Sequence, residues 1–152
     1  MSTLEALHDV KAMVARGDIR QALIYLNRQS GYRFTSLYRF DDQTLRNVEF
    51  YDHDRPDLAR TDDIAVMASY CVFVRDSGGA FYTPDSLEDQ RLAGHPKRPQ
   101  VRAYCGVPLI DDRGRVFGTV CHFDFVPLPF NPVDLELLEL LAPSLQRGAS
   151  LR

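Results

Sequence analysis

Apolar residues recur at helical spacing near both ends of the chain. In residues 3–16 they are three or four positions apart, which predicts a first helix. Asp18 is placed to cap a second helix, and Gly31 is suited to end it. Residues 132–147 show the same periodicity and predict a closing helix, although Pro143 is expected to bend or interrupt it.

Between these helices the apolar pattern has a period of two, as in half-buried strands. Residues 33–40 alternate, and after a short turn residues 45–51 complete an antiparallel hairpin. Residues 101–125 contain two longer apolar runs joined by the turn DDRGR, which predicts a second hairpin.

Two polar loops, residues 52–68 and 84–100, lie in the middle of the chain. The segment SYCVFVRDSGG predicts a short helix capped by Ser69 and ended by Gly78, and a short strand before Pro84 follows. Antiparallel hairpins flanked by terminal helices predict an α+β fold, with those helices on one face of the sheet. The middle loops would then cover the other face, where we expect a concave ligand pocket.

The composition narrows the function classes. The 152 residues are 45% hydrophobic and 26% charged, which is typical of a single globular domain, here residues 1–152. A net charge of −3 and scattered basic residues argue against nucleic-acid binding. No apolar run is long enough to span a membrane, and the charged N-terminal segment lacks the apolar core of a signal peptide. We therefore expect a cytoplasmic protein.

The three cysteines, Cys71, Cys105 and Cys121, are expected to be free thiols, since their number is odd and nothing indicates export. Their spacing does not fit a zinc site, so no metal is predicted. Strand alternation places Cys105 and Cys121 among apolar neighbours, which favours structural roles for both. For His122 we expect a satisfied core histidine, with Asp124 accepting its ring N–H, in place of a metal ligand.

The segment from residue 104 to 124 resembles the signature of the GAF domain, a small-molecule-sensing module of bacterial and eukaryotic signalling proteins. The matching residues are Tyr104, Gly106–Leu109, Gly114, Gly118–Thr119, Val120–Cys121 and Asp124. With the upstream short helix and strand, the resemblance covers about residues 18 to 145. It implies a GAF-like antiparallel sheet, similar in layout to profilin and PAS domains, whose first and last helices often form a dimer bundle.

Most markers of particular GAF subfamilies are absent from the sequence. The motif N-K-x-x-x-F-D-E of the cyclic-nucleotide-binding group does not occur. Phytochrome-type domains attach a bilin ahead of the signature, whereas the pair Cys121–His122 lies in the last strand. Free methionine sulfoxide reductases share a cysteine at the short helix, but they carry C-D-x-x-S-x-S-E where this chain reads HPKRPQVRAYCGVPL. We expect no haem, flavin or bilin, and the cofactor stays unassigned.

The pattern and the resemblance together nominate seven candidate ligand-binding residues. They are Ser69, Cys71, Phe73, Tyr82, His95, Tyr104 and Cys121. A helix N-terminus favours a thiolate at Cys71, although a small buried side chain beside an ordinary cap is the simpler interpretation. His95 either recognises an anionic ligand together with Lys97 and Arg98 or belongs to a solvated basic loop. Tyr82 and Tyr104 offer phenol groups at the edge of an apolar site.

Three functions fit these residues. The first is a non-enzymatic sensor that binds an unidentified small molecule and relays its occupancy to a separate signalling protein, unless the domain belongs to a longer sensor. The second is a thiol enzyme resembling free methionine sulfoxide reductases, using Cys71 with Cys105 or Cys121. The third is a dimerisation module without a ligand. A homodimer through the helices at residues 3–16 and 132–147 is expected.

Overall fold

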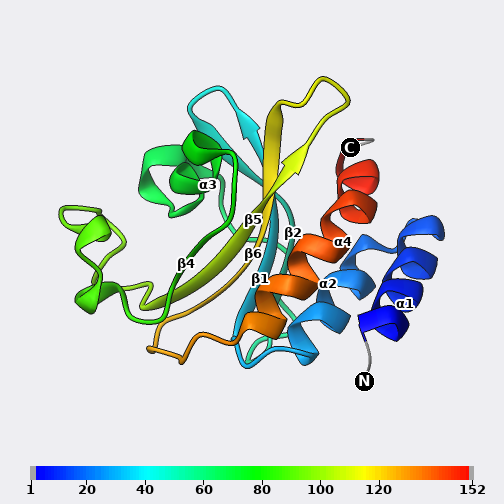
Figure 1. The fold of residues 1–152 in the computed structure, drawn as a ribbon, viewed down its shortest axis with the longest axis horizontal. Coiled ribbons are helices and arrows are strands. Elements are labelled where there is room, and N and C mark those ends of the chain that lie inside the picture. The colour runs from blue at the N-terminus through cyan, green and yellow to red at the C-terminus, as the bar shows by residue number, and fades with distance from the viewer. Residues whose placement is uncertain (1–2, 151–152) are drawn as a thin grey trace.

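The computed structural model describes residues 3–150, which form one antiparallel sheet with helices on both faces (Figure 1). The strand order is β3-β2-β1-β6-β5-β4. The strands are β1 Phe34–Asp41, β2 Thr44–Asp52, β3 Ile64–Ala65, β4 Phe81–Thr83, β5 Ala103–Ile110 and β6 Val116–Asp124. The α-helices are α1 Thr3–Ala15, α2 Ile19–Arg28, α3 Cys71–Ser77 and α4 Pro132–Ser150. No helix within residues 3–150 is long and apolar enough to cross a membrane.

The helices α2 and α4 cover one face of the sheet, and α1 packs on the outer side of these two helices (Figure 1). On α4 the residues that face the sheet are fully buried leucines: Leu138, Leu141 and Leu145. The sheet meets them with Leu37, Cys105, Val107, Leu109 and Val120. Burial of a leucine side chain contributes about 1.5–3 kcal/mol, so this layer is a main source of stability. The predicted α+β fold is confirmed.

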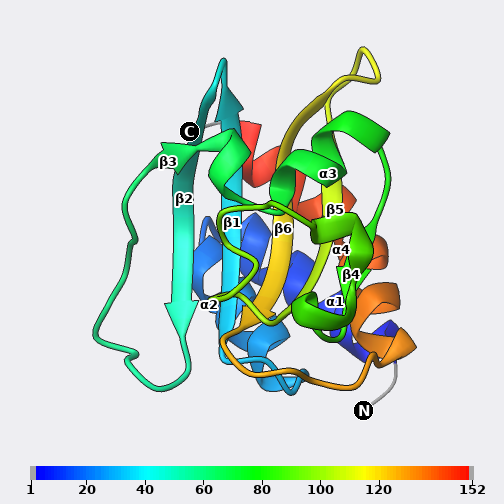
Figure 2. The same cartoon turned by 90° about the vertical axis from the view of Figure 1, so that its left-hand side faces the viewer.

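The other face of the same strands carries the alternate residues. Tyr38, Tyr104 and Cys121 belong to a second apolar cluster, which includes α3 and β4. Figure 2 shows α3 and the loops in front of this face of the sheet. Cys105 pairs with His122 and shares its face of the sheet. Cys121 precedes His122 along β6 and points to the opposite face, because successive side chains of one strand alternate.

The segment predicted as the loop 52–68 contains the edge strand β3. Ile64 and Ala65 pair with Leu45 and Thr44 of β2. Val66 follows and is fully buried, which anchors the return of the chain to the sheet. A strand of two residues is too short to leave a period-two signal in the sequence, so only the pairing with β2 reveals it.

Two predicted helix ends differ from the structure. Asp18 caps α2 as expected, but the helix ends at Arg28, and Gly31 is not in the left-handed conformation. Ser30 stops the helix instead, donating from its N–H and its hydroxyl to the Asn27 carbonyl at 2.9 and 2.8 Å. α4 runs through the exposed Pro143 without the interruption that was expected there.

Gly118 of β6 lies opposite Arg39 of β1, where a Cβ would overlap the carbonyl oxygen of Tyr38. We expect Gly118→Ala to lower the free energy of unfolding by about 1–3 kcal/mol, as overpacking does. Gly79→Ala is the control, since no atom lies within 4 Å of its Cβ position. That variant should change stability by less than about 0.5 kcal/mol. Urea unfolding measures both, and equal stabilities would contradict the argument.

Candidate functional site

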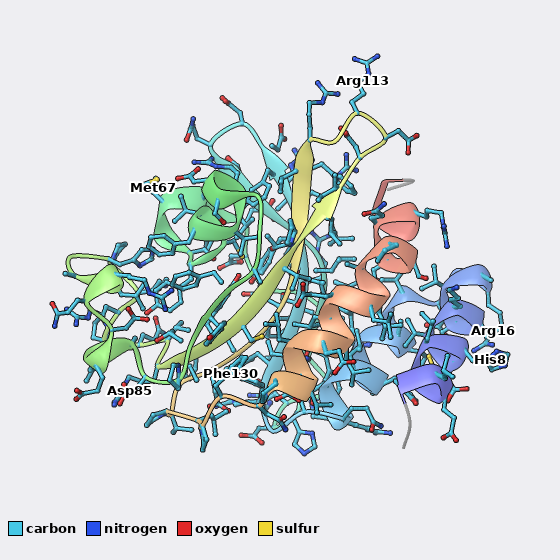
Figure 3. The ribbon with its side chains drawn as sticks, viewed as in Figure 1. His8, Arg16, Met67, Asp85, Arg113 and Phe130 are labelled. Atoms are coloured by element: carbon cyan, nitrogen blue, oxygen red, sulfur yellow. The ribbon has the colours of Figure 1, made fainter. Side chains whose placement is uncertain are left out.

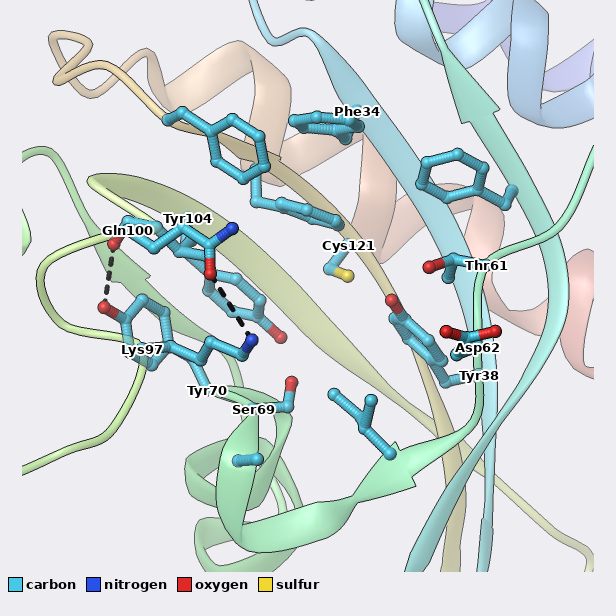
Figure 4. Close-up of a pocket in the computed structure, with 16 residues that line it drawn as sticks. Phe34, Tyr38, Thr61, Asp62, Ser69, Tyr70, Lys97, Gln100, Tyr104 and Cys121 are labelled. Atoms are coloured by element: carbon cyan, nitrogen blue, oxygen red, sulfur yellow. Dashed lines mark hydrogen bonds between the residues drawn. The ribbon is translucent and has the colours of Figure 1, made fainter. Parts of the chain in front are cut away.

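A cavity of about 190 Å³ lies on the sheet face opposite α1, α2 and α4 (Figure 4). Its floor is the surface of β1 and β6, and its walls are the segment before α3 and the loop before β5. The lining residues are Phe34, Tyr38, Phe50, Thr61, Asp62, Ile64, Ala68, Ser69, Tyr70, Lys97, Gln100, Val101, Tyr104, Cys121, Phe123 and Phe125.

The floor of the cavity is aromatic because alternate strand residues point to this face. Phe34 of β1 stacks on Phe123 of β6, with ring centroids 4.7 Å apart. Phe50 and Phe125 flank Phe34 at 5.8 and 4.8 Å. Rings at these separations attract one another and present an apolar surface to a ligand.

The rim of the cavity is polar. Thr61 and Asp62 come from the segment before β3, and Lys97 and Gln100 from the loop before β5 (Figure 4). The Lys97 ammonium donates to Gln100 Oε1 at 3.4 Å, and no carboxylate among residues 3–150 pairs with it. A lysine held only by an amide is free to pair with an acidic group of a ligand.

A cluster of thiols and hydroxyls closes the inner end of the cavity. Cys71 Sγ lies 3.2 Å from the Tyr104 hydroxyl and 3.1 Å from Thr119 Oγ1. The thiol of Cys121 also donates to it. Tyr104 reaches Cys71 because Gly106, two residues along β5, has no side chain, and a Cβ there would overlap the phenol ring.

This cluster favours the thiolate form of Cys71. Burial alone raises the pKa of a thiol. Four groups oppose that effect by hydrogen-bonding to the sulfur: the thiol of Cys121 and the hydroxyls of Ser69, Thr119 and Tyr104. Together they lower the pKa of Cys71 from 9.0 to about 7. Burial and the neighbouring thiolate raise the pKa of Cys121 well above its ordinary value, so its proton stays in place.

Comparison with known protein families and solved structures identifies the family of this fold. The sequence matches the family model described as the GAF domain over residues 18–146. This chain belongs to the GAF domain family. A comparison with curated proteins gave no match.

Solved structures share the GAF fold at low sequence identity. The GAF domain of a phosphoenolpyruvate-protein phosphotransferase from Acinetobacter is 15% identical, with a TM-score of 0.78 over 99% of this chain and 95% of that chain. The counterpart from Coxiella burnetii is 12% identical, with a TM-score of 0.74 over 98% and 93%. The free methionine-R-sulfoxide reductase from Neisseria meningitidis, solved with its substrate, is 19% identical, with a TM-score of 0.76 over 97% and 88%. Identities this low establish a common fold alone.

The GAF sheet separates the three cysteines. Cys105 faces the helices, where burial together with nearby Asp134 raises its pKa to about 12. Cys71 and Cys121 lie together on the cavity face. A pairing of Cys71 with Cys105, one arm of the predicted thiol enzyme, is wrong because the sheet stands between them.

The predicted ligand residues fall into two groups. Ser69, Tyr104 and Cys121 line the cavity, and Cys71 lies directly behind them. Ser69 is not the N-cap of α3, which is Tyr70, but its hydroxyl accepts the Cys71 N–H at 3.1 Å. The predicted cap was wrong by one residue because a 3₁₀ turn, Val66–Ala68, precedes it.

Phe73, Tyr82 and His95 do not line the cavity. Phe73 stacks on Phe81 behind α3, with ring centroids 4.7 Å apart. Tyr82 is 39% exposed and stacks on Phe130, which Figure 3 labels, with ring centroids 3.9 Å apart. His95 supports the wall: its Nε2–H donates to the Ser69 carbonyl at 3.2 Å while Nδ1 accepts the Lys97 N–H at 3.1 Å. Burial lowers the pKa of His95, in keeping with a neutral ring.

His122 is a satisfied core histidine, but its partner is not Asp124. Thr35 Oγ1 accepts from Asn27 Nδ2 at 2.9 Å and donates to His122 Nδ1 at 2.7 Å. Asp124 accepts the backbone N–H of Arg33 at 3.0 Å instead. Burial lowers the pKa of His122 to about 3. The imidazole points to the helix face because residue 122 is out of phase with the cavity-facing Cys121.

Several cavity residues were not nominated from the sequence. Phe123 shares the strand face of Cys121, so alternation along β6 was the available signal. Phe50, Thr61, Asp62 and Gln100 come from the far strand or from loops, and only the packing of β2 and the loops brings them to the cavity.

The depressed pKa of Cys71 leads to a direct test. Because an acid with a lowered pKa ionises earlier, the ultraviolet thiolate absorbance of the folded protein should rise as pH passes about 7. Cys71→Ser should remove this step, and Cys105→Ser should leave it unchanged. A first step near the ordinary value of 9.0 in the folded protein would show that the hydroxyls do not stabilise the thiolate.

Proposed function

We propose that this GAF domain is a sensory module that binds a small amphiphilic acid in the cavity between the sheet and its loops. The observation that supports the proposal is the combination of an aromatic floor, built on Phe34 and Phe123, with the ammonium of Lys97 at the rim, which has no carboxylate partner within residues 3–150. An apolar portion of the ligand stacks on the floor, and its acidic group pairs with Lys97.

The volume limits the size of the ligand. An apolar cavity of about 150 Å³ holds benzene, and this one measures about 190 Å³. By the same measure, the part of the ligand enclosed in the cavity has about eight non-hydrogen atoms. Asp62, on the opposite side of the cavity from Lys97, would also accept an ammonium group of such a ligand (Figure 4).

Occupancy is relayed through β6 to the helix face. Cys121 lines the cavity, while the next residue, His122, is part of the polar network under the helices. A shift of β6 on binding thus reaches α2 through Asn27, which donates to Thr35. Two parts of the relay stay predictions: a partner signalling protein that binds the helices, and a homodimer through α1 and α4. The exposed side chains of Val133 and Leu140 on α4 are available for such contacts.

The test is a thermal-shift screen of the purified chain with probes that differ in one group. The probes are benzoate, free leucine, free methionine sulfoxide, and the amide and N-acetyl forms of leucine. Comparing them shows whether binding needs the carboxylate of the ligand, its ammonium group or both. A ligand at roughly 100 times its Kd stabilises the fold by about 2.7 kcal/mol. If no probe raises the melting temperature, the ligand proposal fails and the dimerisation module takes its place.

Lys97 provides the matched variant. Lys97→Glu should weaken binding of the acid found in the screen at least about tenfold, because it replaces attraction by repulsion in a partly desolvated site. Lys11→Glu makes the same charge change on the exposed surface of α1, at the other face of the sheet, and should leave the affinity unchanged. Equal loss in both variants would mean that net charge, not Lys97, attracts the acid.

The screen also separates a sensor from an enzyme. With methionine sulfoxide and a thiol reductant, a sensor leaves the concentration of the sulfoxide constant over time. Production of methionine that Cys71→Ser abolishes would replace the sensory proposal by the thiol-enzyme alternative.

A further inference from the structure

The wall of the cavity that carries Thr61 and Asp62 lies beside the edge of the sheet. Figure 2 shows the whole connection, residues 53–63, looping out from β2 and returning to β3. Within residues 3–150, β3 pairs only with the first two residues of β2. Residues 60–63, which precede β3, therefore lie along β2 without strand pairing, and other contacts must fix their position.

Asn47 of β2 supplies those contacts. Its backbone N–H donates to Asp63 Oδ1 at 2.9 Å, and its carbonyl oxygen accepts from Arg60 Nη2 at 2.9 Å. Its side-chain Oδ1 accepts the backbone N–H of Thr61 at 3.3 Å. Both neighbours of Asp62 in the chain, and Arg60 before them, are thus bound to a single residue of the sheet.

The side-chain amide of Asn47 also connects this wall to the floor strands. Its Nδ2 donates to Ser36 Oγ and to the Glu49 carbonyl oxygen, each at 3.1 Å. Ser36 of β1 lies opposite Cys121 of β6, which lines the cavity. Asn47 is only 3% exposed, and an amide buried to this extent depends on its protein partners. The wall therefore keeps a fixed position relative to the floor.

Asp62 depends on these contacts for its own position. Its carboxylate makes no hydrogen bond or ion pair within residues 3–150, whereas Thr61 and Asp63 are both bound to Asn47. Asp62 nevertheless lines the cavity, across from Lys97 (Figure 4). The place of the carboxylate is therefore decided by Asn47 through the residues on either side.

We propose that Asn47 is a positioning residue, which fastens residues 60–63 to the sheet and thereby places the Asp62 carboxylate to accept the ammonium group of a ligand. The inference rests on the proposed function, because it takes Asp62 as the partner of that group. A ligand with both charges uses Lys97 and Asp62, whereas an acid without an ammonium group uses Lys97 alone. Asn47 thus favours ammonium-bearing acids without touching the ligand.

Asp63 provides the variants, because it is exposed and its substitution leaves the core intact. Asp63→Ala removes the acceptor of the Asn47 N–H, whereas Asp63→Asn keeps a neutral acceptor in the same place. Asp57→Ala is the matched control. It removes the same charge from the same exposed segment, but Asp57 pairs with Arg55 and not with Asn47.

Trypsin cleavage measures the wall without any ligand. Arg60 is the only cleavable site within residues 53–63, because the other arginine there precedes a proline. We expect Asp63→Ala to raise the rate of cleavage after Arg60 at least about fivefold, since the loss of one hydrogen bond to a charged group shifts local opening by that factor. Asp63→Asn should be cleaved more slowly than Asp63→Ala, and Asp57→Ala at the wild-type rate.

Ligand affinity measures the selectivity. Asp63→Ala should weaken binding of free leucine at least about fivefold, because the ammonium group loses a charge-assisted contact. Binding of benzoate, which has no ammonium group, should be unchanged. A general loss of stability would weaken both probes together, so the difference between them reports on Asp62. Asn47→Ala should show the same difference, with circular dichroism to check its fold; the exposed Asp63 variants decide the matter where it does not fold.

Two results would overturn the proposal. In the first, Asp63→Ala is cleaved after Arg60 no faster than the wild type. In the second, Asp63→Ala binds leucine without loss, or loses leucine and benzoate equally. If no acid in the screen binds the wild type, the proposed function and the selectivity built on it both fall. The cleavage rates, which need no ligand, then decide by themselves whether Asn47 fastens the wall.

Discussion

The central position of β6 is the constraint on which the rest of the structure depends. β6 is hydrogen-bonded to β1 on one side and β5 on the other, and it is covered on both faces. Its residues 118–122 are all buried, and each belongs either to the helix layer or to the cavity face. Thr119, Cys121 and Phe123 serve the cavity, whereas Val120 and His122 serve the helix layer.

Glycine completes this arrangement at two points. At Gly118 the strand packs so closely that the Tyr38 carbonyl occupies the space of a Cβ, and at Gly106 the Tyr104 ring does so. The glycines of the two motifs thus have a physical reason. Gly106 of G-V-P-L lets the Tyr104 phenol reach Cys71, and Gly118 of G-T lets the strand β1 approach closely. The buried Tyr104 hydroxyl and Cys71 thiol would cost free energy if they were unpaired. The glycine that lets them meet is therefore needed together with both residues.

The two faces of β6 carry buried polar networks with opposite electrostatic preferences. On the cavity face, hydroxyls and a thiol converge on Cys71 and favour a negative charge. On the helix face, His122 is held neutral between Thr35 and the ring of Tyr32, 5.4 Å away, and burial lowers its pKa to about 3. One strand thereby connects a site able to hold a charge with a core that excludes one.

Part of the site could be read from the sequence. The period of two along residues 101–125 predicted the second hairpin and apolar neighbours for Cys105 and Cys121, and the motif residues indicated the GAF fold. The loops were less predictable. Lys97 and Gln100 reach the rim through a loop of 3₁₀ and other turns, and Asp62 through a segment that ends in the two-residue strand β3. Neither segment has a periodicity that records where its side chains point.

The sequence by itself determined the layers of this protein. Local periodicity sets which side of each strand or helix is apolar, because side-chain direction repeats with the backbone geometry. Only the tertiary structure decided which residues meet across those layers. Cys71 and Cys121 are separated by fifty positions in the chain, and Thr35 and His122 by 87. Such contacts depend on strand register and on how α3 lies on the sheet, which no local pattern encodes.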